Sequence, residues 1–338
     1  MFNTSQVVIR NQHLLESTAT LVMNPPPDQL LLELTQPVQV LTWDFSVYQT
    51  LTNQRVANVE FAPVSSGDEH FAQALIFMPK SQAEFDLLWA TARARLKPAA
   101  TVWIVGEKRE GINTAAKRLQ SQNLSLVKLD SARHCQLWRV TGVNPAAAPE
   151  LKTLFQTFSV ACGERSLQVA SLPGVFNVGR LDEGTALLLE HLGEVPAGRL
   201  LDFGCGAGVI GACLKARQPA AQVELVDIHA LALASTRETL ALNGLEGKVY
   251  PSDGLAQVEG RYRGIYTNPP FHTGVKTDYR ITANLIREAR ERLEKGGELR
   301  LVANAFLHYP DLIRDVFGNC ETLAETTRFK AYRAVRTS

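Results

Sequence analysis

The stretch Leu200-Leu201-Asp202-Phe203-Gly204-Cys205-Gly206-Ala207-Gly208-Val209-Ile210-Gly211 places four glycines within eight consecutive positions. An apolar run that ends in an acid precedes the glycines, and a helical pattern follows them. Glycine allows a tight turn and lets a ligand approach the main chain without a Cβ in the way. The stretch therefore predicts a strand, a turn that holds a cofactor, and a helix.

The glycine spacing by itself leaves the identity of the cofactor open. Gly206, Gly208 and Gly211 match the dinucleotide fingerprint, with Asp227 about where a ribose partner belongs. Three features favour a different cofactor: Gly204 precedes the triplet, the acid Asp202 ends the first strand, and a second motif follows downstream. A turn with no ligand is the remaining alternative, and four such closely spaced glycines disfavour it.

The second motif is Asn268-Pro269-Pro270-Phe271, which follows a short predicted strand. Two consecutive prolines stiffen the backbone and present carbonyls without competing donors. An amide beside a fixed carbonyl can accept both hydrogens of an exocyclic NH₂ group, and an aromatic ring can stack on a planar base. The alternative is an ordinary Asn-Pro turn with no function, which is common in proteins. The position of this motif, downstream of a predicted cofactor turn, favours a functional role. We therefore expect Asn268, Pro269 and Phe271 to carry the chemistry.

Strand and helix patterns alternate from about residue 184 onward. The predicted strands are Arg199–Asp202, Gln222–Asp227, Gly264–Thr267 and Leu299–Ala303, and the predicted helices are Val209–Arg217, His229–Leu242 and Asn284–Leu293. This alternation predicts an α/β fold with a mostly parallel sheet and helices on both faces. Residues 328–336 alternate like a last, antiparallel strand. Ligands of such sheets bind outside the carboxyl ends of the strands.

The first half of the chain resembles a degenerate copy of the second. Three pairs of segments match in the same order: Gln39–Asp44 with Gln222–Asp227, Ile76–Pro79 with Tyr266–Pro269, and Val102–Val105 with Leu299–Val302. The small-residue and proline stretch at 141–149 is typical of a linker. We therefore expect two tandem domains, residues 1–142 and 151–338.

The first of these domains lacks the residues that carry the chemistry of the second. No glycine precedes Gly67, so the cofactor turn cannot form there in the same way. Asn24-Pro25-Pro26-Pro27 looks like an acceptor motif, but it stands where the glycine turn would belong. Met78, at the position matched to Asn268, has no amide. We expect the first domain to be catalytically dead.

Composition excludes several classes of protein. The 338 residues are 45% hydrophobic and 20% charged, with 35 Lys and Arg against 34 Asp and Glu, so the net charge is +1. That balance argues against bulk coating of nucleic acid and against a disordered chain. No run approaches the ~18 apolar residues of a membrane span, and the first residues do not resemble a signal peptide.

The near-neutral total conceals a local excess of basic residues. Residues 1–92 carry three basic residues against nine acids, whereas residues 93–139 carry ten against three. A solvated helical face is one interpretation. The other is a surface that contacts RNA phosphates.

The cysteines favour a reducing compartment. There are five, an odd number, and they are scattered with no C-x-x-C pair. Neither a disulfide framework nor a structural zinc site is expected, and we predict no metal and a cytoplasmic location.

The two motifs together resemble the class I S-adenosylmethionine-dependent methyltransferases, over roughly residues 170 to 338. The resemblance implies two Rossmann-like domains and a set of residues that bind S-adenosylmethionine. The cofactor residues so implied are Asp202, Gly204, Gly206 and Gly208 for the methionine part, Asp227 for the ribose, Ile228 and Asp253 for the adenine, and Asn268 beside the methyl group. The Asn-Pro-Pro-Phe motif marks members that methylate exocyclic or amide nitrogens.

Two further stretches narrow the resemblance. Residues 171–185 and 106–113 are similar to the ribosomal RNA small subunit methyltransferase C family, whose two-domain layout also matches. The resemblance implies methylation of the guanine N2 amine of one 16S rRNA guanosine on the 30S subunit. We also expect a monomer with no membrane partner.

Other activities stay open at this point. A related family modifies a guanosine of 23S rRNA, and adenine N6 and protein glutamine methyltransferases use similar acceptor motifs. A nicotinamide dehydrogenase is a more distant alternative. A ribosome assembly factor that has lost turnover would not need the complete set of motif residues.

Overall fold

The computed structural model describes residues 1–176, 179–269 and 275–338, with side chains of the helix after residue 274 described from residue 282. The chain divides into two compact units, Met1–Leu154 and Phe155–Ser338. The division lies beyond the predicted linker at 141–149. The first part of that linker is hydrogen-bonded to the first unit. The backbone N–H of Ala146 donates to the carbonyl of Arg93, and the Arg93 side chain donates to the carbonyl of Asn144.

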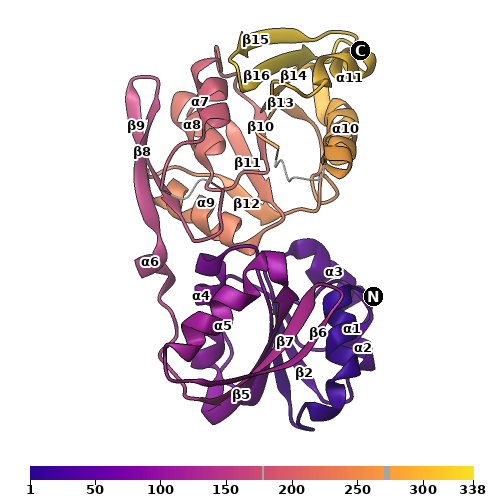
Figure 1. Ribbon diagram of the computed structural model, residues 1–338. Helices are drawn as coiled ribbons and strands as arrows, with labels where there is room; N and C mark the ends of the chain where they lie inside the picture. The colour runs from indigo at the N-terminus through magenta and orange to yellow at the C-terminus, as the bar shows by residue number, and fades with distance from the viewer. Residues whose placement is uncertain (177–178, 270–274) are drawn as a thin grey trace. The chain divides into compact units, whose positions relative to one another are not determined.

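The second unit is built on one seven-stranded sheet (Figure 1). Its strands are β10 (Arg199–Phe203), β11 (Gln222–Asp227), β12 (Lys248–Pro251), β13 (Tyr262–Thr267), β14 (Leu293–Asn304), β15 (Glu321–Glu325) and β16 (Phe329–Val335). Their order in the sheet is β12-β11-β10-β13-β14-β16-β15, and β16 runs antiparallel to both of its neighbours. The predicted parallel sheet with an antiparallel last strand is confirmed.

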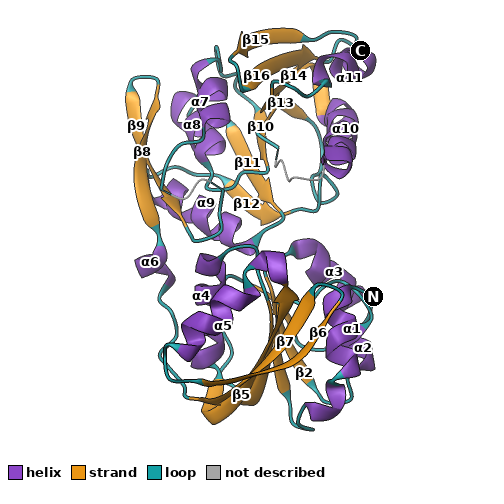
Figure 2. Ribbon diagram, viewed as in Figure 1, coloured by secondary structure: helices purple, strands orange, loops and turns teal. Residues whose placement is uncertain are grey.

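Helices cover both faces of this sheet, as Figure 2 shows. They are α7 (Glu183–Glu190), α8 (Val209–Arg217), α9 (Ala230–Leu242), α10 (Val275–Arg292) and α11 (Tyr309–Phe317). The first three lie on one face, and α10 and α11 lie on the other. One cluster of buried side chains joins β10, β13 and β14 to α10 and α11. It includes Leu201, Ile265, Leu299 and Ile313, each at most 1% exposed.

The sequence predicted the bounds of several of these elements correctly. Helix α8 and strand β11 have the predicted bounds. Helix α9 begins after His229, whose Nδ1 accepts from the backbone of Leu231, and it ends at Asn243 followed by Gly244 at φ 61°. A residue at positive φ that ends a helix is most often glycine, because no Cβ resists the turn.

A two-stranded hairpin precedes this sheet. After the short helix α6 (Leu151–Leu154), strands β8 (Gln156–Cys162) and β9 (Arg165–Ser171) pair antiparallel. The hairpin packs against α9, where Thr239 Oγ1 accepts from the backbone N–H of Ala170 at 3.0 Å. It thereby covers the helices that follow the glycine turn.

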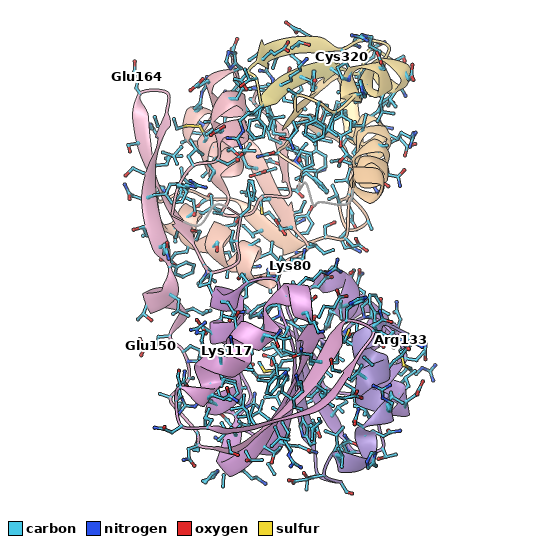
Figure 3. All side chains as sticks on the ribbon, viewed as in Figure 1. Lys80, Lys117, Arg133, Glu150, Glu164 and Cys320 are labelled. Atoms are coloured by element: carbon cyan, nitrogen blue, oxygen red, sulfur yellow. A yellow bond between two sulfur atoms is a disulfide. The ribbon has the colours of Figure 1, made fainter. Side chains whose placement is uncertain are left out.

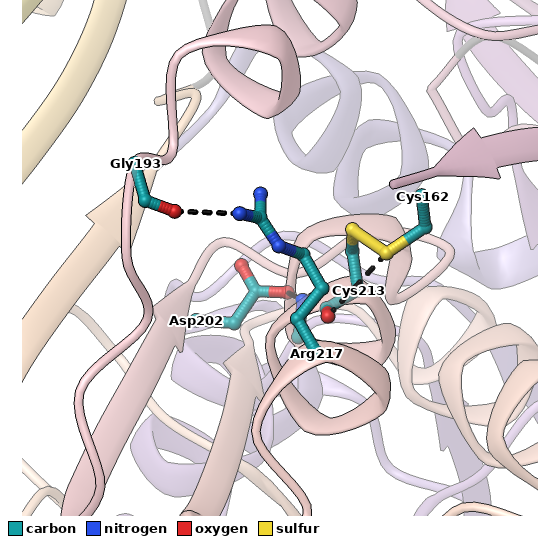
Figure 4. The surroundings of a disulfide bond; sticks show 6 residues. Cys162, Gly193, Asp202, Cys213 and Arg217 are labelled. Atoms are coloured by element: carbon teal, nitrogen blue, oxygen red, sulfur yellow. Dashed lines mark hydrogen bonds between the residues drawn. A yellow bond between two sulfur atoms is a disulfide. The ribbon is translucent and has the colours of Figure 1, made fainter. Parts of the chain in front are cut away.

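The prediction that the cysteines carry no disulfide is wrong for one pair. Cys162 of β8 and Cys213 of α8 are joined by a disulfide, although 51 residues separate them in the chain (Figure 4). Both residues are buried. Spacing along the chain could not predict the pair, since packing of the hairpin on α8 brings the two together. Cys135, Cys205 and Cys320 are free.

The first unit repeats the same architecture. Its strands are β1 (Thr20–Met23), β2 (Val38–Thr42), β3 (Val59–Phe61), β4 (Phe71–Phe77), β5 (Leu96–Glu107), β6 (Ser125–Ala132) and β7 (Cys135–Val143). Their order is β3-β2-β1-β4-β5-β7-β6, which is the order of the second sheet strand for strand. Its helices are α1 (Asn3–Arg10), α2 (Leu30–Glu33), α3 (Phe45–Asn53), α4 (Gln82–Ala94) and α5 (Ile112–Gln120), with short 3₁₀ turns η1 (Gln12–Leu14) and η2 (Lys108–Glu110).

Irregularities in strand pairing recur at matching places in the two sheets. The pairing of β4 with β5 shifts register between Phe71 and Gln73, and that of β13 with β14 shifts between Tyr262 and Gly264. The outer hairpins, β6 with β7 and β15 with β16, share a second shift. Bulges are specific features of a fold rather than accidents of composition. Their recurrence supports duplication.

The register also corrects two of the three sequence matches. Ile76 and Thr267 occupy the same place in their sheets, one residue away from the predicted match. Leu41 corresponds to Val226, two residues away from its predicted partner. The third match, Val102–Val105 with Leu299–Val302, agrees with the pairing. Apolar strands look alike in sequence, so only the hydrogen-bonded ladder fixes the alignment.

None of the helices in the described ranges is long and apolar enough to cross a membrane.

Candidate active site

The carboxyl ends of four neighbouring strands carry the predicted site residues. Phe203 at the end of β10 pairs with Val226 of β11 and with Thr267 of β13, and Asp227 pairs with Pro251 of β12. The glycine turn, Asp227, Asp253 and Asn268 follow directly from these strand ends. The sheet therefore brings the predicted cofactor and acceptor residues to one edge, as expected for an α/β sheet.

The glycine turn has the backbone that its sequence predicts. Gly204, Gly206 and Gly208 have φ of 67°, 54° and 78°, values that side chains resist. A Cβ on Gly208 would lie 3.0 Å from Thr236, whereas a Cβ on Gly206 would project into open space. Gly206 is thus the position of the turn where a ligand can approach the main chain.

Asp202 lies beneath the turn and is fully buried. Its Oδ2 accepts from the backbone N–H of Gly211 at 2.7 Å, while its equally enclosed Oδ1 has no hydrogen-bond partner in the described ranges. The pKa of the Asp202 carboxyl is raised to about 7: burial is the main cause, the Gly211 N–H opposes the shift, and the nearby Asp227 carboxylate adds to it. A cation brought to the turn would relieve the cost of this buried charge.

Asp227 ties the turn to the next strand. Its Oδ2 accepts from Gly206 N at 2.9 Å, and its Oδ1 accepts from His229 N at 2.9 Å. A carboxylate has about four lone-pair sites, so it can accept further bonds from ligand hydroxyls. Ile228 beside it is half-buried, and Asp253 after β12 is exposed.

Asn268 is held by two residues to which the sequence analysis gave no role. Its Nδ2 donates to Asp182 Oδ2 at 2.7 Å and to Thr185 Oγ1 at 2.9 Å. An ionised carboxylate only accepts hydrogen bonds, so the NH₂ group must face it and the amide oxygen must face the other way. Asp182 and Thr185 stand within the stretch that carries the family resemblance. Their contact with Asn268 spans more than eighty residues and leaves no local signal.

The two residues also build the start of α7. Asp182 caps the helix by accepting from Thr185 N at 2.8 Å, and the Thr185 hydroxyl lies 3.3 Å from the same carboxylate oxygen. Gly184 between them leaves room, since a Cβ there would lie 3.1 Å from both Asp182 Oδ2 and the Phe329 ring. The Asp-Glu-Gly-Thr sequence at 182–185 therefore begins helix α7 and also holds the side chain of Asn268 by hydrogen bonds.

Part of the acceptor motif falls outside the described residues. Pro269 is buried next to Asn268. Phe271, predicted to stack on the acceptor base, lies in the range 270–274, which is outside the described residues.

The same edge of the first unit is built from different residues. Asn24 follows β1 where Gly204 follows β10 and has φ 50°, and prolines at 25–27 replace the rest of the turn. Proline has no N–H, so this turn cannot donate as Gly206 does. The strand register places Phe77, rather than the predicted Met78, at the position of Asn268.

The fit to a cofactor rests on three features of the second unit. An enclosed carboxylate oxygen lacks a partner, a glycine turn leaves open space over its main chain, and a carboxylate ends the adjacent strand. A ligand with a positive charge and vicinal hydroxyls matches them. In the part of the chain that the structure covers, no group of three or more His, Cys, Asp or Glu side chains is placed to hold a metal ion.

The strand order with one reversed strand, the glycine turn and the polar strand ends together define a class I methyltransferase fold. Two family models match the chain: Methyltransferase small domain at residues 166–333, and Methyltransferase small domain N-terminal at residues 5–158. Ribosomal RNA small subunit methyltransferase C of Pseudomonas entomophila is 47% identical over 332 residues, and that of Pseudomonas paraeruginosa is 46% identical over 335 residues. Each alignment covers 98% of both chains. The chain belongs to the ribosomal RNA small subunit methyltransferase C family.

A solved structure shares the whole two-unit fold. The T. thermophilus 16S rRNA N2 G1207 methyltransferase in complex with AdoMet and guanosine matches with a TM-score of 0.85 at 23% identity, over 99% of this chain and 92% of that chain. The match confirms the predicted tandem α/β architecture.

Proposed function

We propose that this chain methylates the exocyclic N2 amine of one guanosine of 16S rRNA, with S-adenosylmethionine as the methyl donor and the 30S subunit as the substrate particle. The curated relatives carry the name of that activity, and the similar solved structure is described with AdoMet and guanosine. Guanosine 1207 of 16S rRNA, the nucleotide for which that similar methyltransferase is named, is the target we propose for this chain.

One observation in this chain carries the proposal: the fixed orientation of Asn268. Its NH₂ group is held by Asp182 and Thr185, so its carbonyl oxygen faces away from them. Asn268 itself follows the strand end that pairs with the strand leading into the glycine turn. A carbonyl oxygen accepts from an N–H and repels another acceptor. The site is therefore suited to an amine acceptor rather than to a ring nitrogen with a bare lone pair.

The cofactor would be held by the residues of the glycine turn and the strand ends. We assign Gly204, Gly206 and Gly208 to the methionine part, Asp227 to the ribose hydroxyls, and Ile228 with Asp253 to the adenine. Asp202, fully buried, acts through its charge and through its bond to Gly211. S-adenosylmethionine supplies a methyl group on a positively charged sulfur when it is bound.

The acceptor side follows from the chemistry of guanine. The lone pair of its N2 amine is delocalised into the ring, which makes the amine a poor nucleophile. Asn268 Oδ1 and the Pro269 carbonyl would accept the two N–H groups, which orients the nitrogen and stabilises the positive charge that develops on it. Phe271 would stack on the extruded base. Positioning of this kind can supply effective molarities of about 10⁵ M or more.

The nitrogen gains a fourth bond when it takes the methyl group, so it must then lose one of its two original protons. We propose that the proton leaves to water after transfer, by way of the carbonyl that already accepts it. The Asn268 amide is too weak a base to keep the proton. At saturating S-adenosylmethionine the rate should therefore depend little on pH around neutrality.

The first unit is proposed to bind no cofactor. Prolines at 25–27 remove the N–H donors of its turn, and Phe77 stands where Asn268 would be. Calorimetry with S-adenosylmethionine should give one site per chain, and two sites would contradict the assignment.

A cytoplasmic location and a monomeric state complete the proposal. A ribosomal substrate favours a cytoplasmic location, and the Cys162–Cys213 disulfide is an exception to the usual state of cysteines in that compartment. Sedimentation equilibrium tests the monomer.

Parallel transfer assays test the function directly. Labelled S-adenosylmethionine is offered with 16S rRNA, 30S subunits and 23S rRNA, and the modified nucleoside is identified by mass and mapped. The proposal predicts N2-methylguanosine at one position of the small-subunit RNA, with 30S subunits the best substrate. Label in 23S rRNA, label on adenine N6, or no transfer would each contradict it.

A further inference from the structure

The basic residues between 93 and 139 fall into two groups in the structure. Some contact other residues of the first unit, and three lie together in a cluster. Arg95 is buried and donates to the Glu69 carbonyl, Arg118 pairs with Asp86 at 2.8 Å, Arg93 donates to the Asn144 carbonyl, and Lys128 lies over the Trp138 ring. Lys108, Arg109 and Arg133, by contrast, gather in one place. Part of the excess charge is therefore concentrated in one cluster, rather than all of it being spread along a helical face.

These three cations line a cavity at the carboxyl edge of the first sheet. It has a volume of about 320 Å³, enough for a phosphate group and the sugar beside it. Strand β5 and the hairpin of β6 and β7 meet there, and the backbone N–H of Lys108 donates to the carbonyl of His134 at 3.0 Å. The lining residues are Asn3, Glu107, Lys108, Arg109, Arg133 and His134.

The cavity keeps a net positive charge. Arg133 donates to the neutral amide of Gln6, a contact that leaves its charge uncompensated. Arg109 is 81% exposed, and its Nε lies 2.6 Å from Glu107 Oε2. A guanidinium has five N–H donors in a planar fork, so Arg109 can hold this carboxylate and a phosphate at once. Three cations thus face one carboxylate.

The turn between β6 and β7 has a backbone conformation that its residues, Arg133 and His134, do not favour. Ala132 pairs with Cys135, so Arg133 and His134 form a two-residue turn, with φ of 50° and 65°. A turn with both central residues at positive φ strongly favours Asn-Gly. A long cation and an imidazole in these positions cost free energy, and strained residues of this kind cluster at functional sites.

We propose that this cavity, the basic cavity, binds a backbone phosphate of the RNA substrate. This inference rests on the proposed rRNA substrate, and it gives the first unit a task in substrate binding without catalysis. Lys108, Arg109 and Arg133 supply the cations that face the phosphate oxygens. A phosphate contact positions an RNA without reading its bases.

The hairpin itself offers a sharp test. The double change Arg133→Asn with His134→Gly removes the cation and supplies the residues that the turn prefers, so the variant should unfold no more easily than the wild type. Lys108→Gln is the second variant. Lys117→Gln is the matched control, because Lys117 is an exposed lysine of the same unit on the side away from Arg133 (Figure 3).

Binding of 16S rRNA and of 30S subunits is measured directly across a range of salt concentrations, alongside methyl transfer. We expect the hairpin variant and Lys108→Gln each to weaken RNA binding by about tenfold, and each to reduce the slope of log K against log salt by about one. KM for RNA should rise by the same factor, while kcat and cofactor affinity stay unchanged.

Unchanged affinity and salt slope in both variants, or an equal loss in Lys117→Gln, would overturn the basic cavity as a phosphate site. Wild-type protein that binds rRNA but transfers no methyl group would instead count against the proposed function. The two failures are therefore distinguishable.

Discussion

Asp182 Oδ2 lies 2.7 Å from Asn268 Nδ2, and this contact decides which way the amide of Asn268 faces. The same oxygen caps helix α7 through Thr185 N. Asn268 is thus fixed by the start of helix α7 rather than by its own loop. Rigid support of this kind is what holds a reacting group in its productive geometry.

Asp182→Asn tests this support. Asparagine still caps a helix well, so the variant should fold. Its side chain offers the Asn268 amide a carbonyl or an NH₂ group in place of a charge, so the amide is free to turn over. We expect kcat to fall about 10- to 100-fold, with cofactor affinity unchanged, in steady-state methyl transfer and calorimetry.

The neighbouring Glu183→Gln is the control for Asp182→Asn. Glu183 pairs with Arg328 on the exposed side of the same helix start, and its loss should leave kcat within about twofold. Equal effects of the two changes would show that the helix start matters only for folding.

Asp202 predicts a pH dependence of stability. Its pKa is about 7 when folded, against ~3.9 in an unfolded chain, so between these values the folded protein holds a proton that the unfolded chain has lost. Stability should therefore fall as pH rises from about 4 to 7. Without cofactor, Asp202→Asn should be the more stable protein at pH 8, by a few kcal/mol.

Denaturant unfolding at pH 5 and pH 8 measures this effect. All four tryptophans lie in the first unit, so their fluorescence follows that unit, whereas far-UV circular dichroism reports both. The difference in pH dependence between wild type and Asp202→Asn should appear in the dichroism and not in the fluorescence, to which buried carboxyls of the first unit such as Glu84 contribute equally in both proteins. Equal pH slopes for wild type and Asp202→Asn would contradict the buried, protonated carboxyl.

Gly206 of the glycine turn and Gly211 in the first turn of α8 should respond differently to substitution. A Cβ on Gly211 would lie 2.2 Å from Leu225 Cδ2, so Gly211→Ala should cost about 1–3 kcal/mol of stability through overpacking. Gly206→Ala meets open space and only the strain of its positive φ, about 1–2 kcal/mol, yet it fills the approach to the main chain. We expect it to lose at least tenfold in cofactor affinity, measured by calorimetry. Wild-type affinity in Gly206→Ala would contradict the placement of the ligand.

The number of free thiols tests the disulfide. Protein purified without reductant and unfolded in denaturant should show three reactive thiols, those of Cys135, Cys205 and Cys320. Five thiols would contradict the Cys162–Cys213 bond. Prior reduction should raise the count to five and lower the unfolding free energy by about 2–4 kcal/mol.

Local patterns predicted much of the fold. The bounds of α8 and β11, the cap of α9 and the edge at which the site lies follow from neighbouring residues, as does the positive φ that the glycine turn requires. Duplication was also visible in the sequence. Its alignment was wrong by one and two residues in two strands, since buried strands of similar composition can slide past one another.

What the sequence did not predict depends on contacts between distant segments. Asp182 and Asn268 are 86 residues apart, and Cys162 and Cys213 are 51 apart. Each contact exists because helices and strands pack, and neither residue pair has a distinctive spacing. The gathering of Lys108 with Arg133 is of the same kind, because a hairpin returns the chain to the end of β5.

The central claim is that Asn268 holds the acceptor amine, and Asn268→Ala tests it most directly. Single-turnover methyl transfer to 30S subunits should fall about 10³-fold, because the developing charge loses its partner, while S-adenosylmethionine binds with an affinity within about twofold of wild type. Retained transfer at the wild-type rate would contradict the account, as would a parallel loss of cofactor binding.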